Sequence, residues 1–188
     1  MKYKILITFI TVSINLQAQG IEISLKNGTD QEKKGKEQLE RIVAQYHEWI
    51  FTTKVEIDEN AIPFSHPVLT LNCNDLDNDV KQLSNFLHEQ FHWLEESMPT
   101  QREKTINDFK TLFPEVPVGG RSGARSSYST YLHLIVCDLE FQSMTKVVGE
   151  EKARQILSEW THYTWIYDKV LHDNRIREIN AKNGFLVP

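Results

Sequence analysis

Residues 88 to 92 read His88-Glu89-Gln90-Phe91-His92, which is an H-E-x-x-H pattern. On an α-helix, residues four positions apart lie on one face, so both imidazoles can reach one metal ion at about 2.0–2.1 Å from each nitrogen. Glu89 then points to a neighbouring edge of the helix, where its carboxylate can accept a proton from a zinc-bound water. The pattern predicts one Zn²⁺ held by His88 and His92, with Glu89 as the general base.

A catalytic zinc needs a third protein ligand and keeps one position for water. The segment from Tyr131 to Val148 carries His133 and Glu140, which are seven residues apart and therefore on nearly the same face of an expected helix. The residues between them are mostly apolar, which indicates a buried polar site. We expect Glu140 as the third ligand and keep His133 as the alternative. If Glu140 binds the metal, His133 is a contact of Glu89 or of the substrate, or a satisfied core histidine.

A tyrosine hydroxyl or a histidine can stabilise the oxyanion that forms during amide hydrolysis. His162 is the preferred candidate for this role and Tyr131 the second, although the aromatic residues around His162 are also typical of core packing. The Gly-rich segment 119–123 is expected to be a mobile loop or lid. Arg121 in this segment and Arg125 just after it are available for a substrate carboxylate.

The periodicity of the chain predicts a mainly α protein with a small β-sheet, an α+β arrangement. Two short strands are expected around residues 55–57 and 67–71, before the helix that carries the motif. The expected helices run from Thr29 or Asp30 to about Phe51, from Asn74 or Asp75 to before Pro99, from Thr100 to Phe113, from Tyr131 to Val148, from Glu150 to Trp160, from Tyr163 to His172, and from Asn174 to Lys182.

The composition is that of an ordinary globular chain, because 40% of its 188 residues are hydrophobic and 25% are charged. Lys2 and Lys4 precede an apolar run and Ala18, which is typical of a secretory signal peptide at residues 1–18. We therefore expect one exported domain at 19–188, secreted or periplasmic, without a membrane span. No long basic run is present, so nucleic acid is not an expected partner.

The motif with a glutamate on a downstream helix resembles the zincin metallopeptidases, and within them the gluzincin branch. This resemblance covers the motif helix and the later helix only. It implies a zincin-like fold, with His88, His92 and Glu140 as zinc ligands and Glu89 as the general base. Leu139 stands where gluzincins usually have an asparagine, and Met144 where an aspartate often contacts the site.

Together these observations predict an exported zinc metallopeptidase that hydrolyses a peptide or another amide substrate. The alternative is a zinc-stabilised binding protein without turnover, in which His133 and Glu140 both join the motif histidines in a closed four-ligand site. The two cysteines, Cys73 and Cys137, either pair in an oxidising compartment or stay as thiols, and the sequence leaves both open.

Overall fold

The computed structural model describes residues 20–187, which form a mainly helical fold with one small sheet, as predicted. The elements are β1 (Glu22–Leu25), α1 (Asp30–Gln45), β2 (Lys54–Ile57), β3 (Leu69–Leu71), α2 (Asp79–Glu96), α3 (Pro99–Leu112), α4 (Ser127–Val148), α5 (Glu150–Ser158), α6 (Thr164–His172) and α7 (Asn174–Lys182). The predicted signal peptide at residues 1–18 lies outside the described residues.

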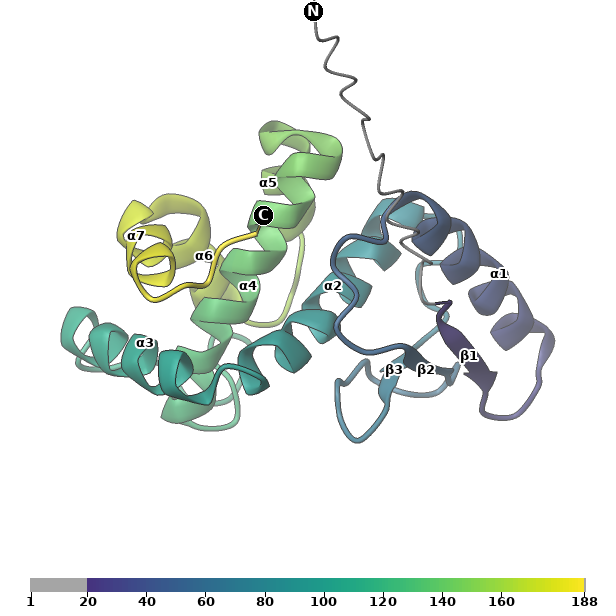
Figure 1. The fold of residues 1–188 in the computed structure, drawn as a ribbon, viewed down its shortest axis with the longest axis horizontal. Helices are drawn as coiled ribbons and strands as arrows, with labels where there is room; N and C mark the ends of the chain where they lie inside the picture. Colours follow the sequence, from purple (N-terminus) through teal and green to yellow (C-terminus); the bar gives the residue numbers. More distant parts are fainter. Residues whose placement is uncertain (1–19, 188) are drawn as a thin grey trace, which may run out of the picture.

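Helix α2 joins the two sides of the molecule, with α1 and the sheet on one side and α3 to α7 on the other (Figure 1). The sheet is parallel, in the order β1-β2-β3. The sequence predicted β2 and β3 but missed β1. Gly35 lets α1 approach this sheet closely, because a Cβ atom there would lie 3.0 Å from Ile57 Cγ2 and 3.1 Å from Cys73 Sγ.

The start of α1 was predicted correctly, because Thr29 is its N-cap and accepts a hydrogen bond from the Glu32 N–H. Its predicted end at Phe51 is wrong, since α1 stops at Gln45. The reason is a tertiary contact. The Gln90 amide oxygen of α2 accepts the N–H groups of Phe51 and Thr52 at 2.7 and 2.9 Å, and these groups therefore bond outside any helix.

The other helices follow the predicted order; α7 has the predicted bounds, and several others begin at a different residue than predicted. Helix α2 is capped by Asn78 instead of Asn74 or Asp75, and its side chain accepts from the Lys81 N–H. Helix α3 begins at Pro99, because a proline fits the first turn, where its missing N–H has no helical partner. Ser126 caps α4, which starts one turn before the predicted Tyr131.

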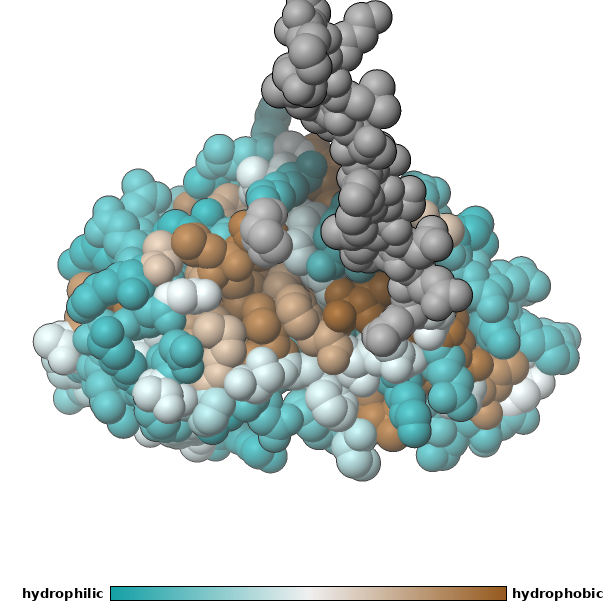
Figure 2. Space-filling view, in the orientation of Figure 1, coloured by the Kyte–Doolittle hydropathy of each residue, from teal (hydrophilic) through white to brown (hydrophobic). Residues whose placement is uncertain are grey.

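The contact between α2 and α4 positions the site. Phe86, Leu87 and Phe91 of α2 are fully buried, as are Leu134 and Ile135 of α4. Burying each such side chain contributes roughly 1.5–3 kcal/mol of transfer free energy. Apolar side chains also gather over the α2 and α4 region on the face that Figure 2 shows. The same helices that form the core therefore carry the motif histidines and His133.

Cys73 and Cys137 are both free, with Cys137 buried in α4, so they do not form a disulfide.

Among residues 20–187, no helix has the length and apolar character needed to cross a bilayer.

Candidate metal centre

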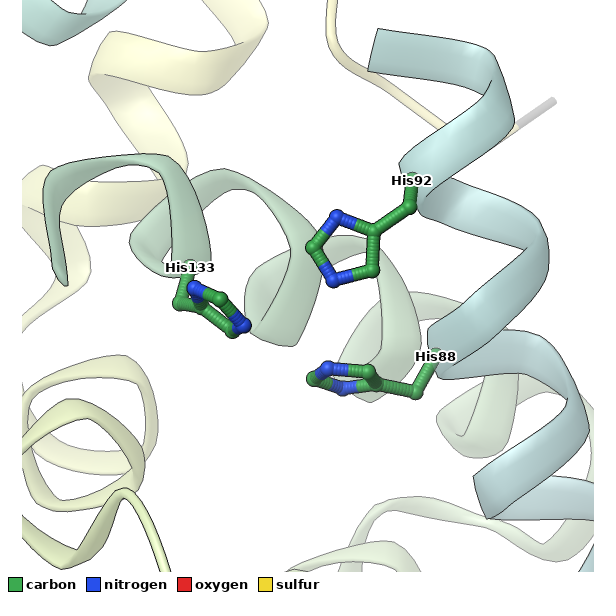
Figure 3. A group of neighbouring side chains, drawn as sticks. All are labelled: His88, His92 and His133. Carbon is green, nitrogen blue, oxygen red and sulfur yellow. The ribbon is translucent and has the colours of Figure 1, made fainter. Parts of the chain in front are cut away.

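Three histidines converge between α2 and α4 (Figure 3). His88 and His92 extend from one face of α2, and His133 faces them from α4. One ligand atom from each ring lies within 4.8 Å of the other two, which is close enough for all three to share a metal ion. The four-residue spacing of the motif thus has the geometric effect that the sequence predicted.

Two of these rings are held through their Nδ1 atoms. His88 Nδ1 donates to Glu140 Oε2 at 3.0 Å, and His133 Nδ1 donates to the Ser129 carbonyl oxygen at 2.6 Å. These contacts leave Nε2 of each ring without its proton and open to a metal. Metal-binding histidines typically donate their other ring N–H to a carboxylate or a carbonyl in this way.

Glu140, the expected third ligand, contacts Nδ1 of His88 and is not part of the three-histidine group. Its buried carboxylate accepts hydrogen bonds from Ser84 Oγ at 2.5 Å, His88 Nδ1 at 3.0 Å and Tyr167 Oη at 2.9 Å. A second group of possible ligands, formed by His88, Cys137 and Glu140, also meets the distance requirement. In that group Glu140 would have to exchange its hydrogen bonds for a metal, and His88 would bind through the nitrogen that now faces Glu140. The three-histidine group needs neither change.

The remaining histidine of the group, His92, has a carboxylate near it within α2. His92 Nδ1 is 3.7 Å from Glu95 Oε1, and the other oxygen of Glu95 accepts from Arg102 at 3.1 Å. Glu95 is itself buried, at 4% exposure. Its position three residues after His92 was the available signal, because residues three apart on a helix are neighbours.

Burial sets the protonation of the site. Desolvation, followed by the proximity of His92, lowers the pKa of both His88 and His133 well below the ordinary value. Both rings are therefore neutral at pH 7, which is the form that binds a metal. Burial, followed by the charge of Glu140, raises the pKa of Glu89 to about 8. Burial also raises the pKa of Glu140 to about 7, although the hydrogen bonds from Ser84 and Tyr167 lower it.

The site opens into a pocket of about 810 Å³ that contains His88, Glu89, His92 and His133 in its wall. Other lining residues come from the segment between β2 and β3, from the start of α4 and from the start of α6, and Asn85 and Glu95 of α2 and Glu140 of α4 also line the pocket. The histidines and the Glu89 carboxylate therefore share one pocket wall.

The two expected oxyanion donors have different positions. His162 lines this pocket as an exposed residue. Tyr131 does not line it, because its hydroxyl donates to the Phe113 carbonyl oxygen at 2.6 Å and the residue lines a separate depression. Tyr163 lies closer to the metal ligands, with its ring centroid 4.3 Å from that of His133.

Tyr163, expected as the first residue of a helix beside His162, is the N-cap of α6. Its backbone has φ 53° and ψ 31°, the left-handed region that a residue with a Cβ seldom adopts. Burial raises the pKa of its hydroxyl to about 12, so the group stays a hydrogen-bond donor. Backbone strain of this kind occurs often at functional sites. Nothing in the sequence around residue 163 indicated this conformation.

Comparisons of the chain with protein-family models, with characterised proteins and with solved structures give no match.

Proposed function

We propose that this protein is a zinc-dependent hydrolase that cleaves amide bonds, with zinc held by His88, His92 and His133. The observation that carries the proposal is the convergence of three imidazoles on one point of an accessible pocket, beside the buried carboxylate of Glu89. Glu140 supports His88 through a hydrogen bond, so in this proposal it orients a ligand and does not bind the metal.

The donor set fits zinc in three respects. Catalytic zinc sites commonly have three protein ligands, and imidazole is a preferred one. The low pKa of His88 and of His133 provides neutral rings without a proton to displace. Hydrogen bonds at Nδ1 fix the orientation of the same two rings. When bound, zinc supplies a Lewis acid that polarises a carbonyl and lowers the pKa of water to about 7.

Other residues of the pocket would transfer the proton and stabilise the oxyanion. Glu89 in its ionised form accepts one proton from the attacking water as the new C–O bond forms, and delivers it to the leaving nitrogen as the C–N bond breaks. A cation in the site would favour this ionised form, against the burial that raises the pKa of Glu89 to about 8. The products are a carboxylic acid and an amine, so water is the only co-reactant. The Tyr163 hydroxyl and the His162 ring, both in the pocket wall, are the donors available to the developing oxyanion.

A zincin relationship remains part of the proposal, in a modified form. The motif roles of His88, Glu89 and His92 are those of the gluzincins, while the third ligand is a histidine from α4. Export is a further prediction from residues 1–18. Mass measurement of the mature chain tests it, and we expect cleavage after Ala18.

The alternative is a zinc-binding protein without turnover. It was expected to use a closed set of four ligands that included Glu140. The three hydrogen bonds received by Glu140 argue against this set, and the accessible pocket favours catalysis.

The test combines metal analysis with one pair of matched substitutions. Glu89→Gln removes the base, whereas Glu48→Gln changes a glutamate that also follows a histidine but lies on the exposed surface. With a mass-coded mixture of N-acetylated peptides as substrate, we expect E89Q to retain zinc and to lose roughly 10²–10⁴-fold in kcat. E48Q should behave as the wild type.

Three results would contradict the proposal. They are hydrolysis by E89Q at the wild-type rate, purified protein that neither contains nor binds zinc, and zinc-loaded wild type that cleaves no peptide in the mixture. The last result, together with stoichiometric zinc, would support the non-catalytic alternative.

A further inference from the structure

The wall of the histidine pocket contains an unusual number of exposed apolar groups. Six large hydrophobic side chains of the described residues are exposed, and Ile62, Phe64 and Tyr128 among them line this one pocket. Ile62, at 85% exposure, and Phe64 lie between β2 and β3, and Tyr128 lies in the first turn of α4. An apolar substrate group would remove this surface from water, which stabilises the complex.

The same pocket has one lysine or arginine in its wall, Arg125, on the exposed surface just before α4. Among residues 20–187, its side chain makes no ion pair or hydrogen bond. Two of the three carboxylates in the pocket wall are used elsewhere, since Glu95 pairs with Arg102 and Glu140 accepts three hydrogen bonds; the third, Glu89, is the proposed base. A planar guanidinium without a partner matches the two oxygens of a carboxylate.

Hydrogen bonds and a close backbone approach fix the backbone next to Arg125. Ala124 donates its N–H to Thr130 Oγ1 at 2.9 Å, and its carbonyl accepts from Gly119 at 2.7 Å. Gly123 has no space for a side chain, because a Cβ atom would lie 2.1 Å from the Pro117 carbonyl oxygen. The backbone is thus held just before Arg125, and on its other side Ser126 caps α4, so the guanidinium starts from a fixed point of the chain.

The spacing along α4 relates Arg125 to the histidines. Ser126 is the N-cap of α4 and His133 is seven residues later, which corresponds to roughly 10 Å along the axis at about 1.5 Å per residue. An extended peptide covers about 3.3–3.6 Å per residue, and an arginine side chain reaches back over part of the distance. A carboxylate at Arg125 therefore lies one or two residues beyond an amide bond placed at His133.

We infer that the pocket accepts peptides by their C-terminal end, with the terminal carboxylate bound by Arg125 and an apolar side chain lying against Ile62 and Phe64. This inference rests on the proposed function and narrows it to removal of one or two residues from a free C-terminus. Cleavage within a long chain would leave Arg125 without a partner.

The test uses N-acetylated peptides with a leucine or phenylalanine near the end, each made as the free acid and as the C-terminal carboxamide. For the zinc-loaded wild type, we expect kcat/KM to be roughly tenfold or more higher for the acid than for the carboxamide. This ratio corresponds to the lower end of what a hydrogen bond to a charged group contributes, because Arg125 is exposed. This preference should weaken at high salt, since exposed charges are screened.

Two variants test whether Arg125 causes the preference for the free acid over the carboxamide. Arg125→Ala should reduce the ratio of acid to carboxamide to about one, mainly through KM, and should keep the carboxamide rate. Arg121→Ala is the matched control, because Arg121 is an exposed arginine of the same segment that does not line the pocket. It should keep the wild-type ratio.

The outcomes separate the two proposals. Equal cleavage of acid and carboxamide by the wild type, or an unchanged ratio in R125A, overturns the role of Arg125 while the hydrolase proposal stands. Absence of cleavage of every peptide by the zinc-loaded wild type overturns both.

Discussion

His133→Ala and Glu140→Gln should weaken zinc binding to different extents, because the geometry gives the two residues different tasks. His133 contributes one of the three converging nitrogens, whereas Glu140 holds His88 Nδ1 at 3.0 Å. Loss of a partner that orients a ligand typically reduces metal affinity 10–100-fold. We expect this reduction for E140Q and a larger one for H133A. His47→Ala, a change of an exposed histidine, should have no effect.

The magnitude can be expressed as a thermal shift. A 10–100-fold change in affinity corresponds to roughly 1.4–2.7 kcal/mol of ligand-linked stability when zinc is in excess. For a domain of this size, 1 kcal/mol moves Tm by about 2–4 °C. The rise in Tm on adding zinc should therefore be smaller in E140Q than in the wild type by about 3–11 °C, and smaller still in H133A.

The assay is differential scanning fluorimetry with and without zinc, together with competition against a zinc indicator. Comparing the metal-free proteins separates binding from folding, because a buried amide at position 140 leaves donors unsatisfied and also lowers stability. If E140Q loses more zinc affinity than H133A at equal metal-free Tm, Glu140 is the ligand and the argument from its three hydrogen bonds is refuted.

Two further predictions concern the fold. Glu32 accepts from the N–H groups of Asn27 and Gly28, and although burial raises its pKa, these hydrogen bonds lower it overall. Its contribution is therefore present above pH 4.5 and lost as the pH falls below that, so Glu32→Gln should lower Tm at pH 7 and make little difference near pH 3. Tyr131→Phe should cost about 0.5–1.5 kcal/mol in urea unfolding through the lost bond to Phe113, with hydrolysis unchanged; a large loss of activity would restore Tyr131 as a catalytic candidate.

The sequence predicted those parts of the fold that depend on local signals. The Thr29 cap and the span of α7 were read correctly, because capping and periodicity are properties of neighbouring residues. The early end of α1 could not be predicted, since it depends on Gln90, which is distant in sequence. Strand β1 was missed for a similar reason, because its ladder partner is β2.

The same distinction applies to the site. Two histidines on one helical turn are a local pattern, and the structure places them together. His133 and Glu140 were both expected on one face of α4, which periodicity can show. Periodicity does not give the depth at which α2 crosses α4. In the fold, Glu140 contacts Nδ1 of His88, and His133 faces both motif rings.

The chain between the histidines has a consequence for folding. His92 and His133 are 41 positions apart, and all of α3 lies between them. A shared ion would hold these two points of the chain together only in the folded protein, so its binding free energy would add to the free energy of unfolding. Chelation would remove this contribution, while α3 would keep its packing against α4 and α7.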